Sequence, residues 1–591
     1  MACPGVAEQP GDVAMKSCAH FVDVSDESNL SRSGVHSRGK AARVLLTTVY
    51  GPYAVDDEHG SRLSNPMECY HNQVTRVQGA FSLRMFHRSY GIMMIQANIA
   101  APCTVLDYPD SERFRRELED CNYDIIGISA KLPNVKKVAA MCRLIREHQP
   151  GSTIVVGGHI ANLRTLPERI DADYVVCGEG VRWFRRFLGE DVGQPLRHPC
   201  VTSAVEPRCM GVRLDGWGRK PAAALIPSVG CPMGCNFCST SAMFGGKGRF
   251  VHFYETGDEL FDVMCQLEEK MGTGSFMIMD ENFLFHRRRA LRLLQLMEEN
   301  RKSWALYVFS SADVVSSYSM EQLVGLGISW VWIGVEGRHS SYGKLRNVDT
   351  RQLIGELQAN GIRVLGSTII GLEEHTPLKI EAEIRWAISH DADFHQFMLY
   401  MALPGTPLHE QLAGKGLLLD ESECEEADIH GQSRFNHRHP HIGPGEETEL
   451  LLRAFRQFYA AHGPSVIRMM RTSLDGWLKH KSHPDSRIRK RFEREMAAAP
   501  LLYAAAAWAT LRKFKEDLPI ATIASELLRD LHREFGLKSR LAAPLIGRYL
   551  LLRLHREEKR LARNRPCEPP TFYERAPTAV LPRPTPSVLA G

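Results

Sequence analysis

The sequence lacks any run approaching about 18 apolar residues, and it does not open with a charged segment followed by an apolar one. A helix that crosses a bilayer needs a longer apolar run, and a secretory signal needs the charged-then-apolar order. Both absences argue against a membrane-spanning or secreted protein. We therefore expect a cytoplasmic protein whose contact with the inner face of the membrane, if it has one, is peripheral.

An excess of charge of one sign is also missing. The net charge is +4 over 591 residues, which is too small to argue for nucleic acid as a partner. Twelve of the fifteen cysteines are scattered singly, a pattern unlike that of a disulfide scaffold. It fits a reducing cytosol, where an oxygen-sensitive metal cluster also survives. The composition, 44% hydrophobic and 24% charged, is that of a globular protein of several domains.

The other three cysteines stand close together in the chain. An apolar run at 222–226 predicts a buried strand, and glycines and a proline then predict an exposed loop that holds Cys231, Cys235 and Cys238. Thiolates at this spacing can all turn towards one compact cluster, and they are the usual ligands of iron–sulfur centres. No cysteine or histidine follows until His252, so one metal ion would keep an open coordination position, as in working rather than structural sites.

This CxxxCxxC loop after a strand, with Phe237 just before the last cysteine, resembles the radical S-adenosylmethionine (SAM) superfamily. The resemblance implies a [4Fe-4S] cluster on Cys231, Cys235 and Cys238, whose open iron is chelated by SAM. It also implies an electron donor such as flavodoxin or ferredoxin. One electron then cleaves SAM to a 5′-deoxyadenosyl radical, which abstracts a hydrogen atom from the substrate.

Strands alternate with helices before this loop, over residues 41–192, after a leader over 1–40 that we expect to be disordered. Alternating strands and helices predict an α/β, doubly wound, Rossmann-like domain with ligands at the carboxyl ends of its strands. The expected strands lie at 44–49, 103–107, 125–129, 153–158 and 174–177. The polar segment 51–90 stands where such a domain has a short loop. It is either a surface insertion or a loop that reaches cofactor or substrate.

The same region resembles the cobalamin (B12)-binding domain that precedes many radical SAM enzymes, through residues 105–108, 124–129, 154–159 and 173–180. The Asp-x-His-x-x-Gly signature, whose histidine ligates cobalt, is absent. Relatives without it either hold cobalamin with no histidine ligand or have kept only the fold. The resemblance implies cobalamin as a cofactor, with a fold that has lost its cobalamin as the alternative. His159 is either a cobalt ligand or a strand-end histidine that pairs with backbone groups.

A linker over 193–220 leads to six strand–helix units over 221–412. Six parallel units predict a partial (β/α)6 barrel with its chemistry at the carboxyl ends of the strands. The expected strands lie at 222–226, 275–279, 305–310, 330–335, 363–370 and 394–400.

The resemblance places cofactor-binding residues at these strand ends. Besides Phe237, they are Asp280, Glu281, Asn282, Ser310, Glu336, Arg346, Ile369 and Gly371. Two bland alternatives stay open: Asp280 could cap a helix, and Arg346 could lie in a solvated basic turn. At Gly371 the absent side chain would let a flat adenine approach the strand.

The last third of the chain is predicted to cover the barrel. The histidine-rich segment 413–445 is a loop over the barrel mouth, a metal site or plain surface, and either His430 or Tyr400 could exchange a proton with the substrate. Residues 446–565 show helical periodicity. The apolar stretch 500–511 and the basic, apolar stretch 539–560 predict either a bundle packed on the barrel or an interfacial helix at a membrane. We expect the proline-rich tail, 566–591, to be disordered.

These features resemble the class B radical SAM methyltransferases, and among them the hopanoid methylases, which share this architecture. The function implied is hydrogen abstraction from an unactivated carbon and cobalamin-dependent C-methylation of a hydrophobic, lipid-like substrate. The alternative is cobalamin-free radical C–C coupling or cyclisation of acyl chains, or modification of a water-soluble metabolite. The expected partners are a small-molecule or lipid substrate and the electron donor, with no nucleic acid.

Overall fold

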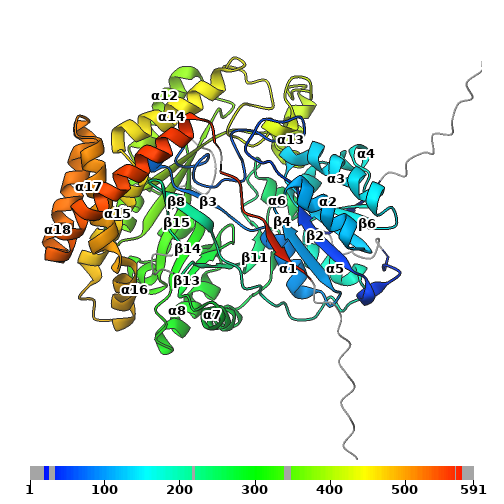
Figure 1. The fold of residues 1–591 in the computed structure, drawn as a ribbon, viewed down its shortest axis with the longest axis horizontal. Helices are drawn as coiled ribbons and strands as arrows, with labels where there is room; N and C mark the ends of the chain where they lie inside the picture. Colours follow the sequence, from blue (N-terminus) through cyan, green and yellow to red (C-terminus); the bar gives the residue numbers. More distant parts are fainter. Residues whose placement is uncertain (1–18, 26–33, 216–219, 338–347, 566, 576–591) are drawn as a thin grey trace, which may run out of the picture.

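The structure is a computed structural model that describes residues 19–25, 34–215, 220–337, 348–565 and 567–575. Figure 1 shows an α/β domain on the right, a second α/β domain in the centre, and a layer of helices on the left. The predicted fold class, a Rossmann-like domain, a partial barrel and a helical C-terminal part, is confirmed.

The N-terminal domain is built on a seven-stranded sheet of order β1-β7-β6-β5-β2-β4-β18. Its five central strands are parallel and apolar, as the sequence predicts, and helices bury both faces of the sheet in two separate cores. These strands are β2 (Val44–Thr48), β4 (Cys103–Asp107), β5 (Ile125–Ser129), β6 (Thr153–Gly157) and β7 (Tyr174–Cys177). The covering helices are α1 (Tyr90–Asn98), α2 (Ser111–Asp120), α3 (Val135–His148) and α5 (Gly180–Phe187).

Both edges of this sheet are covered by chain that the sequence analysis placed outside the fold. Strand β1 (His20–Asp23) pairs in parallel with β7, and β18 (Phe572–Glu574) pairs antiparallel with β4. The predictions of a disordered leader over 1–40 and a disordered tail over 566–591 are wrong for these segments. An edge strand leaves a row of unpaired backbone groups, and each short segment satisfies one such row.

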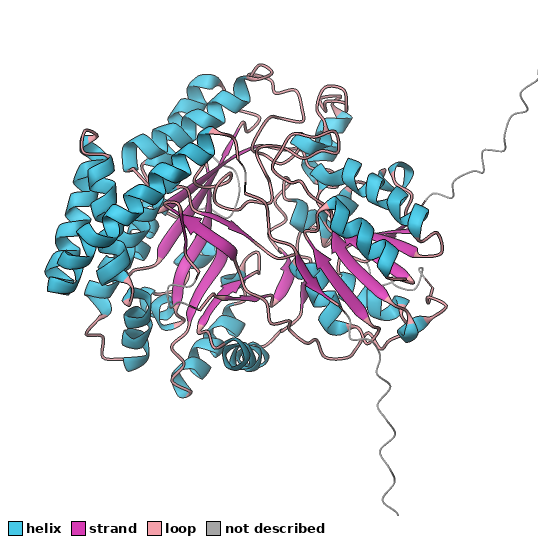
Figure 2. Ribbon diagram, viewed as in Figure 1, coloured by secondary structure: helices cyan, strands magenta, loops and turns pink. Residues whose placement is uncertain are grey.

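The second domain is an open barrel of six parallel strands in the order of the chain. Figure 2 shows these strands wrapped by helices on their outer side. The strands are β10 (Ala223–Leu225), β13 (Ser275–Ile278), β14 (Ala305–Ser311), β15 (Ile328–Glu336), β16 (Arg363–Ile370) and β17 (Phe394–Leu399). The outer helices include α7 (Gly257–Met271), α8 (Arg287–Glu299), α11 (Thr350–Ala359) and α12 (Pro377–Ile388).

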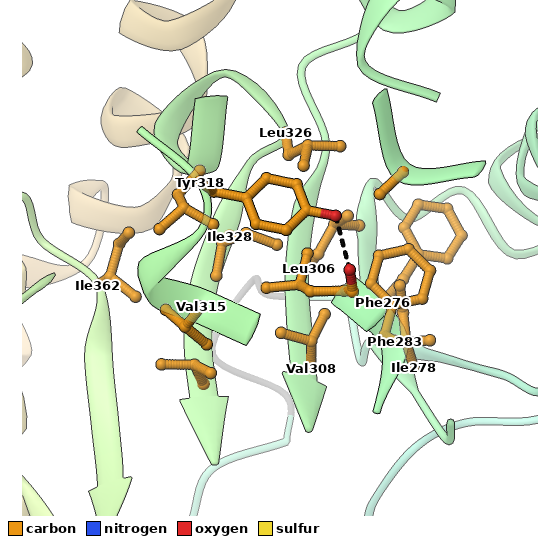
Figure 3. Close-up of a cluster of buried hydrophobic side chains, with 14 of the residues drawn as sticks. Phe276, Ile278, Phe283, Leu306, Val308, Val315, Tyr318, Leu326, Ile328 and Ile362 are labelled. Atoms are coloured by element: carbon orange, nitrogen blue, oxygen red, sulfur yellow. Dashed lines mark hydrogen bonds between the residues drawn. The ribbon is translucent and has the colours of Figure 1, made fainter. Parts of the chain in front are cut away.

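Alternate residues of each barrel strand face opposite sides, as the pleat requires. Outward side chains such as Phe276, Leu306 and Val308 form the core under the helices, where the Tyr318 hydroxyl donates a 2.6 Å hydrogen bond to the Leu284 carbonyl (Figure 3). Residues of the other parity form a chain of aromatic rings with centroids 5.3 to 5.7 Å apart, Phe309–Trp332, Tyr307–Phe309, Trp330–Phe394 and Tyr307–Trp330. This aromatic lining is large and apolar.

The segment 51–90 is not a surface insertion. The hydroxyls of Tyr70 and Tyr307 lie 2.8 Å apart, and the Tyr70 ring meets that of Phe394 at 5.8 Å. Its strand β3 (Arg84–Phe86) pairs with β8 (Val205–Cys209) of the connection between the domains. The segment therefore joins the two domains and reaches the aromatic lining. Its contact with cofactor or substrate stays a prediction.

The C-terminal helices pack against the barrel and share a core with the inward-facing residues Tyr307, Trp330 and Trp332. They are α14 (Glu446–His462), α15 (Ser465–His480), α16 (Ser486–Met496), a π-helical turn at Ala499–Tyr503, α17 (Ala504–Lys513) and α18 (Leu518–Ala562). Gly536 interrupts α18 with non-helical backbone angles. Among the described residues, no helix combines the length and apolarity needed to cross a membrane.

Candidate functional site between the two α/β domains

The carboxyl ends of the two sheets meet at a shared cavity of about 420 Å³. Residues that follow β5 and β6 form one wall, and the ends of β15, β16 and β17 form another. The N-terminal domain contributes Lys131, Leu132, Pro133, His159 and Asn162, and the barrel contributes Phe237, Glu336, Ser367, Ile369, Gln396, Met398 and Tyr400. Both folds place ligands at this end of their strands.

The cysteine loop borders this cavity and is held between two short antiparallel strands, β11 (Ser228–Gly230) and β12 (Phe250–His252). Gly234 turns the loop with φ of 64°, and a Cβ atom there would collide with Lys247. The loop therefore needs glycine at this point for both backbone and packing reasons.

The three thiols of the loop lie half-buried next to one another. Burial, with smaller contributions from the neighbouring acidic groups, raises the pKa of Cys231 to about 12 and that of Cys238 to about 11. No disulfide links the described cysteines. Among the described residues, no three potential ligand side chains already converge on one point as in a preformed metal site. The raised pKa values favour neutral thiols, so binding of these cysteines as thiolates requires a cation.

Aromatic contacts anchor the end of the loop to the barrel. The Phe237 ring meets the Tyr400 ring edge-on at 6.0 Å and packs beside Ile369. The Asn236 amide donates a 3.1 Å hydrogen bond to the Tyr400 hydroxyl. Tyr400, one of the two residues considered for proton exchange, thus holds the cysteine loop in position.

The three polar residues after β13 do three different things. Asp280 is buried; it pairs with Arg289 at 2.6 Å and accepts hydrogen bonds from the Ser228 hydroxyl and the Asn282 backbone. It therefore braces the barrel wall and does not face the cavity, and among the described residues it caps no helix. Glu281 is enclosed by protein yet open to a second cavity, of about 350 Å³, beside the N-terminal sheet, and burial raises its pKa to about 7.

Asn282 and Ser310, both predicted cofactor contacts, are bound to each other. The Ser310 hydroxyl donates to Asn282 Oδ1 at 2.7 Å, and the Ser311 backbone donates to the same oxygen at 3.2 Å. Both side chains are buried. They hold the ends of β13 and β14 together, so Glu281 is the residue of this segment that is available to a ligand.

Glu336 ends β15 inside the cavity wall. Its φ of 55° is unusual for a residue other than glycine, and the pairing with β16 shifts register at this point. Such strain in a buried acidic residue is typical of functional sites. Arg346, predicted to act nearby, lies outside the described residues.

Two predicted cofactor contacts lie at the end of β16 and have different surroundings: Ile369 in the strand and Gly371 just after it. Ile369 lines the cavity beside Phe237. Gly371 has φ of 86°, and a Cβ atom there would overlap the ring of Phe435 from the segment after the barrel. Gly371 thus has to be glycine, but its partner in this structure is Phe435, whereas the sequence analysis assigned that space to an adenine.

The second cavity, of about 350 Å³, enters the N-terminal domain between the sheet and helices α1 and α5. Its mouth is formed by the strand ends Ser129, Gly157–His159 and Gly178–Gly180, and its depth by Ile92, Ile95, Trp183 and Phe184. At Gly158, φ is 85° and a Cβ atom would lie 2.6 Å from the Ala130 carbonyl oxygen. The small residues keep this mouth open at the strand ends that resemble the cobalamin-binding domain, within 124–129, 154–159 and 173–180.

His159 forms part of the wall of both cavities. Its Nε2 lies 3.3 Å from the Thr240 hydroxyl, just after the cysteine loop, and burial lowers its pKa to about 4. The imidazole is therefore neutral at neutral pH. Its partner is a side chain of the other domain, not the backbone groups that the sequence analysis considered.

Sequence reasoning missed Lys131, two residues beyond the end of β5. Protein surrounds this side chain, but its surface is open to the shared cavity, and burial lowers its pKa. Among the described residues its ammonium group has no acceptor. The nearby thiol of Cys69 is the group that counteracts this shift. Its place directly after an apolar strand was the signal that could have identified it.

The histidine-rich segment supplies one cavity residue. His430 lines the shared cavity, and neither ring nitrogen has a hydrogen-bond partner among the described residues. The Nε2 of His439 instead pairs with the Leu372 carbonyl at 3.0 Å. The segment therefore covers the barrel mouth, which was one of the three alternatives that the sequence left open. The described histidines do not assemble a metal site.

Comparison with known families matches two regions of the chain. Residues 78–188 match the B12 binding domain, and residues 225–387 match the radical SAM superfamily. The first region contains the cavity beside Gly157–His159, and the second contains the cysteine loop. Both matches fall within the boundaries that the sequence predicts for the two domains.

Curated relatives with similar sequences include three methyltransferases. An uncharacterised methyltransferase of Pyrococcus horikoshii is 25% identical over 57% of this chain and 78% of its own length. The bacteriochlorophyllide d C-12(1)-methyltransferase of Chlorobaculum tepidum is 23% identical over 49% of this chain and 66% of its own. The hopanoid C-2 methylase of Rhodopseudomonas palustris is 23% identical over 34% of this chain and 39% of its own.

Proposed function

We propose that this chain, a radical SAM enzyme with an N-terminal B12-binding domain, catalyses cobalamin-dependent C-methylation. Its substrate is hydrophobic and lipid-like. The observation that carries this proposal is the shared cavity, since one wall comes from the cobalamin-type domain and the other from the radical SAM barrel. A reaction that uses both cofactors needs such a common space. The three methyltransferase relatives support the same reaction class.

The residues present fit the cofactors that the two domains use. Cys231, Cys235 and Cys238 would hold a [4Fe-4S] cluster, and Glu281 and Glu336 would meet SAM beside it. The cavity whose mouth is Gly157–His159 would hold cobalamin. When bound, the cluster and SAM supply one-electron cleavage of SAM, and cobalamin supplies a transferable methyl group.

The cavity lining supports a hydrophobic substrate. Leu132, Pro133, Ile369 and Met398 line the shared cavity between the domains. Apolar walls bind apolar surface and exclude water from a radical reaction. His430, with unpartnered ring nitrogens among the described residues and a pKa lowered by burial to about 4, is a neutral imidazole in the wall that can accept a hydrogen bond from a polar group of the substrate.

The test is anaerobic reconstitution of the full chain with iron, sulfide and cobalamin, followed by measurement of cobalt per chain. The loaded protein is then mixed with SAM that carries a deuterated methyl group and with a one-electron reductant. Either a lipid extract or a water-soluble metabolite extract is present as the substrate source. We expect a single cobalt per chain and a labelled lipid. The Cys235→Ala variant should bind cobalt but form neither deoxyadenosine nor labelled product.

Two outcomes would contradict the proposal. Deoxyadenosine formed without retained cobalt would favour cobalamin-free coupling or cyclisation of acyl chains. Label transferred to a water-soluble metabolite, with none in the lipid, would exclude the lipid-like substrate while leaving the methylation chemistry intact. Peripheral contact with a membrane through the C-terminal helices belongs to the same proposal, and a donor such as flavodoxin or ferredoxin would supply the electron.

A further inference from the structure

The second half of α18 exposes a row of large apolar side chains. Leu537, Leu541, Leu545, Tyr549 and Leu552 are 71%, 56%, 66%, 47% and 63% exposed. Their spacing of four, four, four and three residues puts all of them on one helix face. At a rise of 1.5 Å per residue this row is about 22 Å long. A continuous apolar row of this length marks an interaction surface more than chance exposure does.

The opposite face of the same helix is fixed in the core. Ala542, Ala543, Leu550 and Leu554 are buried against the preceding helices. The apolar stretch 500–511, which the sequence analysis also considered for a membrane, is largely committed to this core, with four successive buried alanines in α17. The exposed row therefore sits on a rigid support, and within the described chain nothing packs on it (Figure 1).

Every exposed charged residue in the stretch 537–563 is basic. They are Lys538, Arg540, Arg548, Arg556, Lys559 and Arg563. The two acidic residues of the stretch are half-buried, and each has a basic partner: Glu557 pairs with Arg560 at 2.7 Å, and Glu558 pairs with Lys513. Helical spacing places Arg556, Lys559 and Arg563 on the same face as the apolar row, directly beyond Leu552. One face is thus apolar along its first half and cationic along its second.

We propose that this face of α18, residues 537–563, docks on an anionic phospholipid surface. The apolar row would enter the region between headgroups and acyl chains, while the basic side chains meet lipid phosphates. The basic charge favours an anionic lipid surface over a second copy of the chain, because two copies joined through this face would bring like charges together. The inference deepens the proposed function, since a docked enzyme could take a lipid-like substrate from the membrane.

The test is flotation of the full chain, with its cofactors, on vesicles of phosphatidylcholine alone or with phosphatidylglycerol. We expect binding to the anionic vesicles and not to the neutral ones, and weaker binding at high salt. The double variant Leu541→Gln, Leu545→Gln should bind at least about tenfold more weakly, because two apolar side chains no longer enter the bilayer. The matched control is Leu378→Gln, at an 80% exposed leucine of α12, which should bind as the parent does.

The charged half of the face has its own test. Arg556→Gln and Lys559→Gln should each weaken binding to the anionic vesicles about fivefold at low salt. All of these side chains are exposed, so circular dichroism should show unchanged folding.

Three results would overturn the proposal. The first is no binding to either vesicle, and the second is binding that the Leu541→Gln, Leu545→Gln variant retains. The third is a dimer by light scattering that this variant dissociates, because it would make a second copy the occupant. Flotation requires no turnover, so a protein that floats but methylates only water-soluble compounds would refute the lipid substrate and leave the docking face standing.

Discussion

The Asp280 carboxylate offers a direct test of how the site is built. Asp280→Asn keeps the side-chain shape and removes its charge, which leaves the Arg289 guanidinium without its counter-ion. The two side chains are 3% and 2% exposed, and their charged atoms lie 2.6 Å apart. Removing one partner of a buried ion pair costs about 3–5 kcal/mol. We expect Asp280→Asn to lower the free energy of unfolding of the barrel by that amount.

The assay is urea unfolding of the cofactor-free chain, followed by the fluorescence of barrel tryptophans such as Trp304 and Trp330. A chain of several domains need not unfold in one step, so the measured quantity is the midpoint of the transition that these residues report. The matched control is Glu281→Gln, one residue further on and open to the cavity. It should shift stability by less than about 0.5 kcal/mol but weaken SAM binding.

A second substitution separates the ion pair from other effects. In Asp280→Asn combined with Arg289→Met no buried charge is left alone, so most of the lost stability should return. The reasoning fails if Asp280→Asn is as stable as the parent and loses SAM affinity as Glu281→Gln does. That result would mean that Asp280 faces the cofactor and does not brace the wall.

Three further predictions follow from single contacts. Gly371→Ala should destabilise the barrel, because the new Cβ meets the Phe435 ring at a positive φ, and Phe435→Ala should relieve part of that loss in the same urea assay; no relief would refute the contact. Lys131→Met should lose the rise in stability that the parent shows from neutral to alkaline pH: a pKa lowered on folding means that the unfolded chain binds more protons, so stability increases with pH. An equal rise in both proteins would show that the amine is solvated. Tyr70→Phe should cost about 1 kcal/mol through its hydrogen bond to Tyr307, and adding Tyr307→Phe should cost little more; additive losses would contradict the pairing.

Local patterns were sufficient for the central strands of both domains. Strand β16 begins and ends at the residues that the sequence predicts, Arg363 and Ile370, because Gly361 and Gly371, both with positive φ, flank it and break the extended backbone. Strands β1 and β18 could not be predicted in this way. They have four and three residues, and each is a strand only because a sheet edge lies beside it, which is a property of the fold and not of the segment.

The roles of the strand-end residues were partly readable from the alternation of the strand. In β13, Phe276 and Ile278 face the outer core, while Met279 and Glu281, just after the strand, line the second cavity. Continuing the same alternation past the strand end turns Asp280 away from the cavity and Glu281 towards it. Grouping the three polar residues as one cofactor-binding segment overlooked this period of two, and the period would have distinguished the brace from the ligand.

The composition of the shared cavity could not be read from any local pattern, because contacts between distant segments determine how the domains meet. The Glu568 carboxylate accepts hydrogen bonds from the backbone of Tyr53 at 2.8 Å and of Ala54 at 3.1 Å, across 515 and 514 residues of chain. These contacts tie the C-terminal segment to the insertion that also reaches the barrel lining. A cavity wall that contains Lys131 from one domain and Ile369 from the other exists only once such ties are made. For this reason the cavity-facing amine of Lys131 could be found only in the assembled structure. The cluster ligands, placed on Cys231, Cys235 and Cys238 by the family resemblance, stay a prediction.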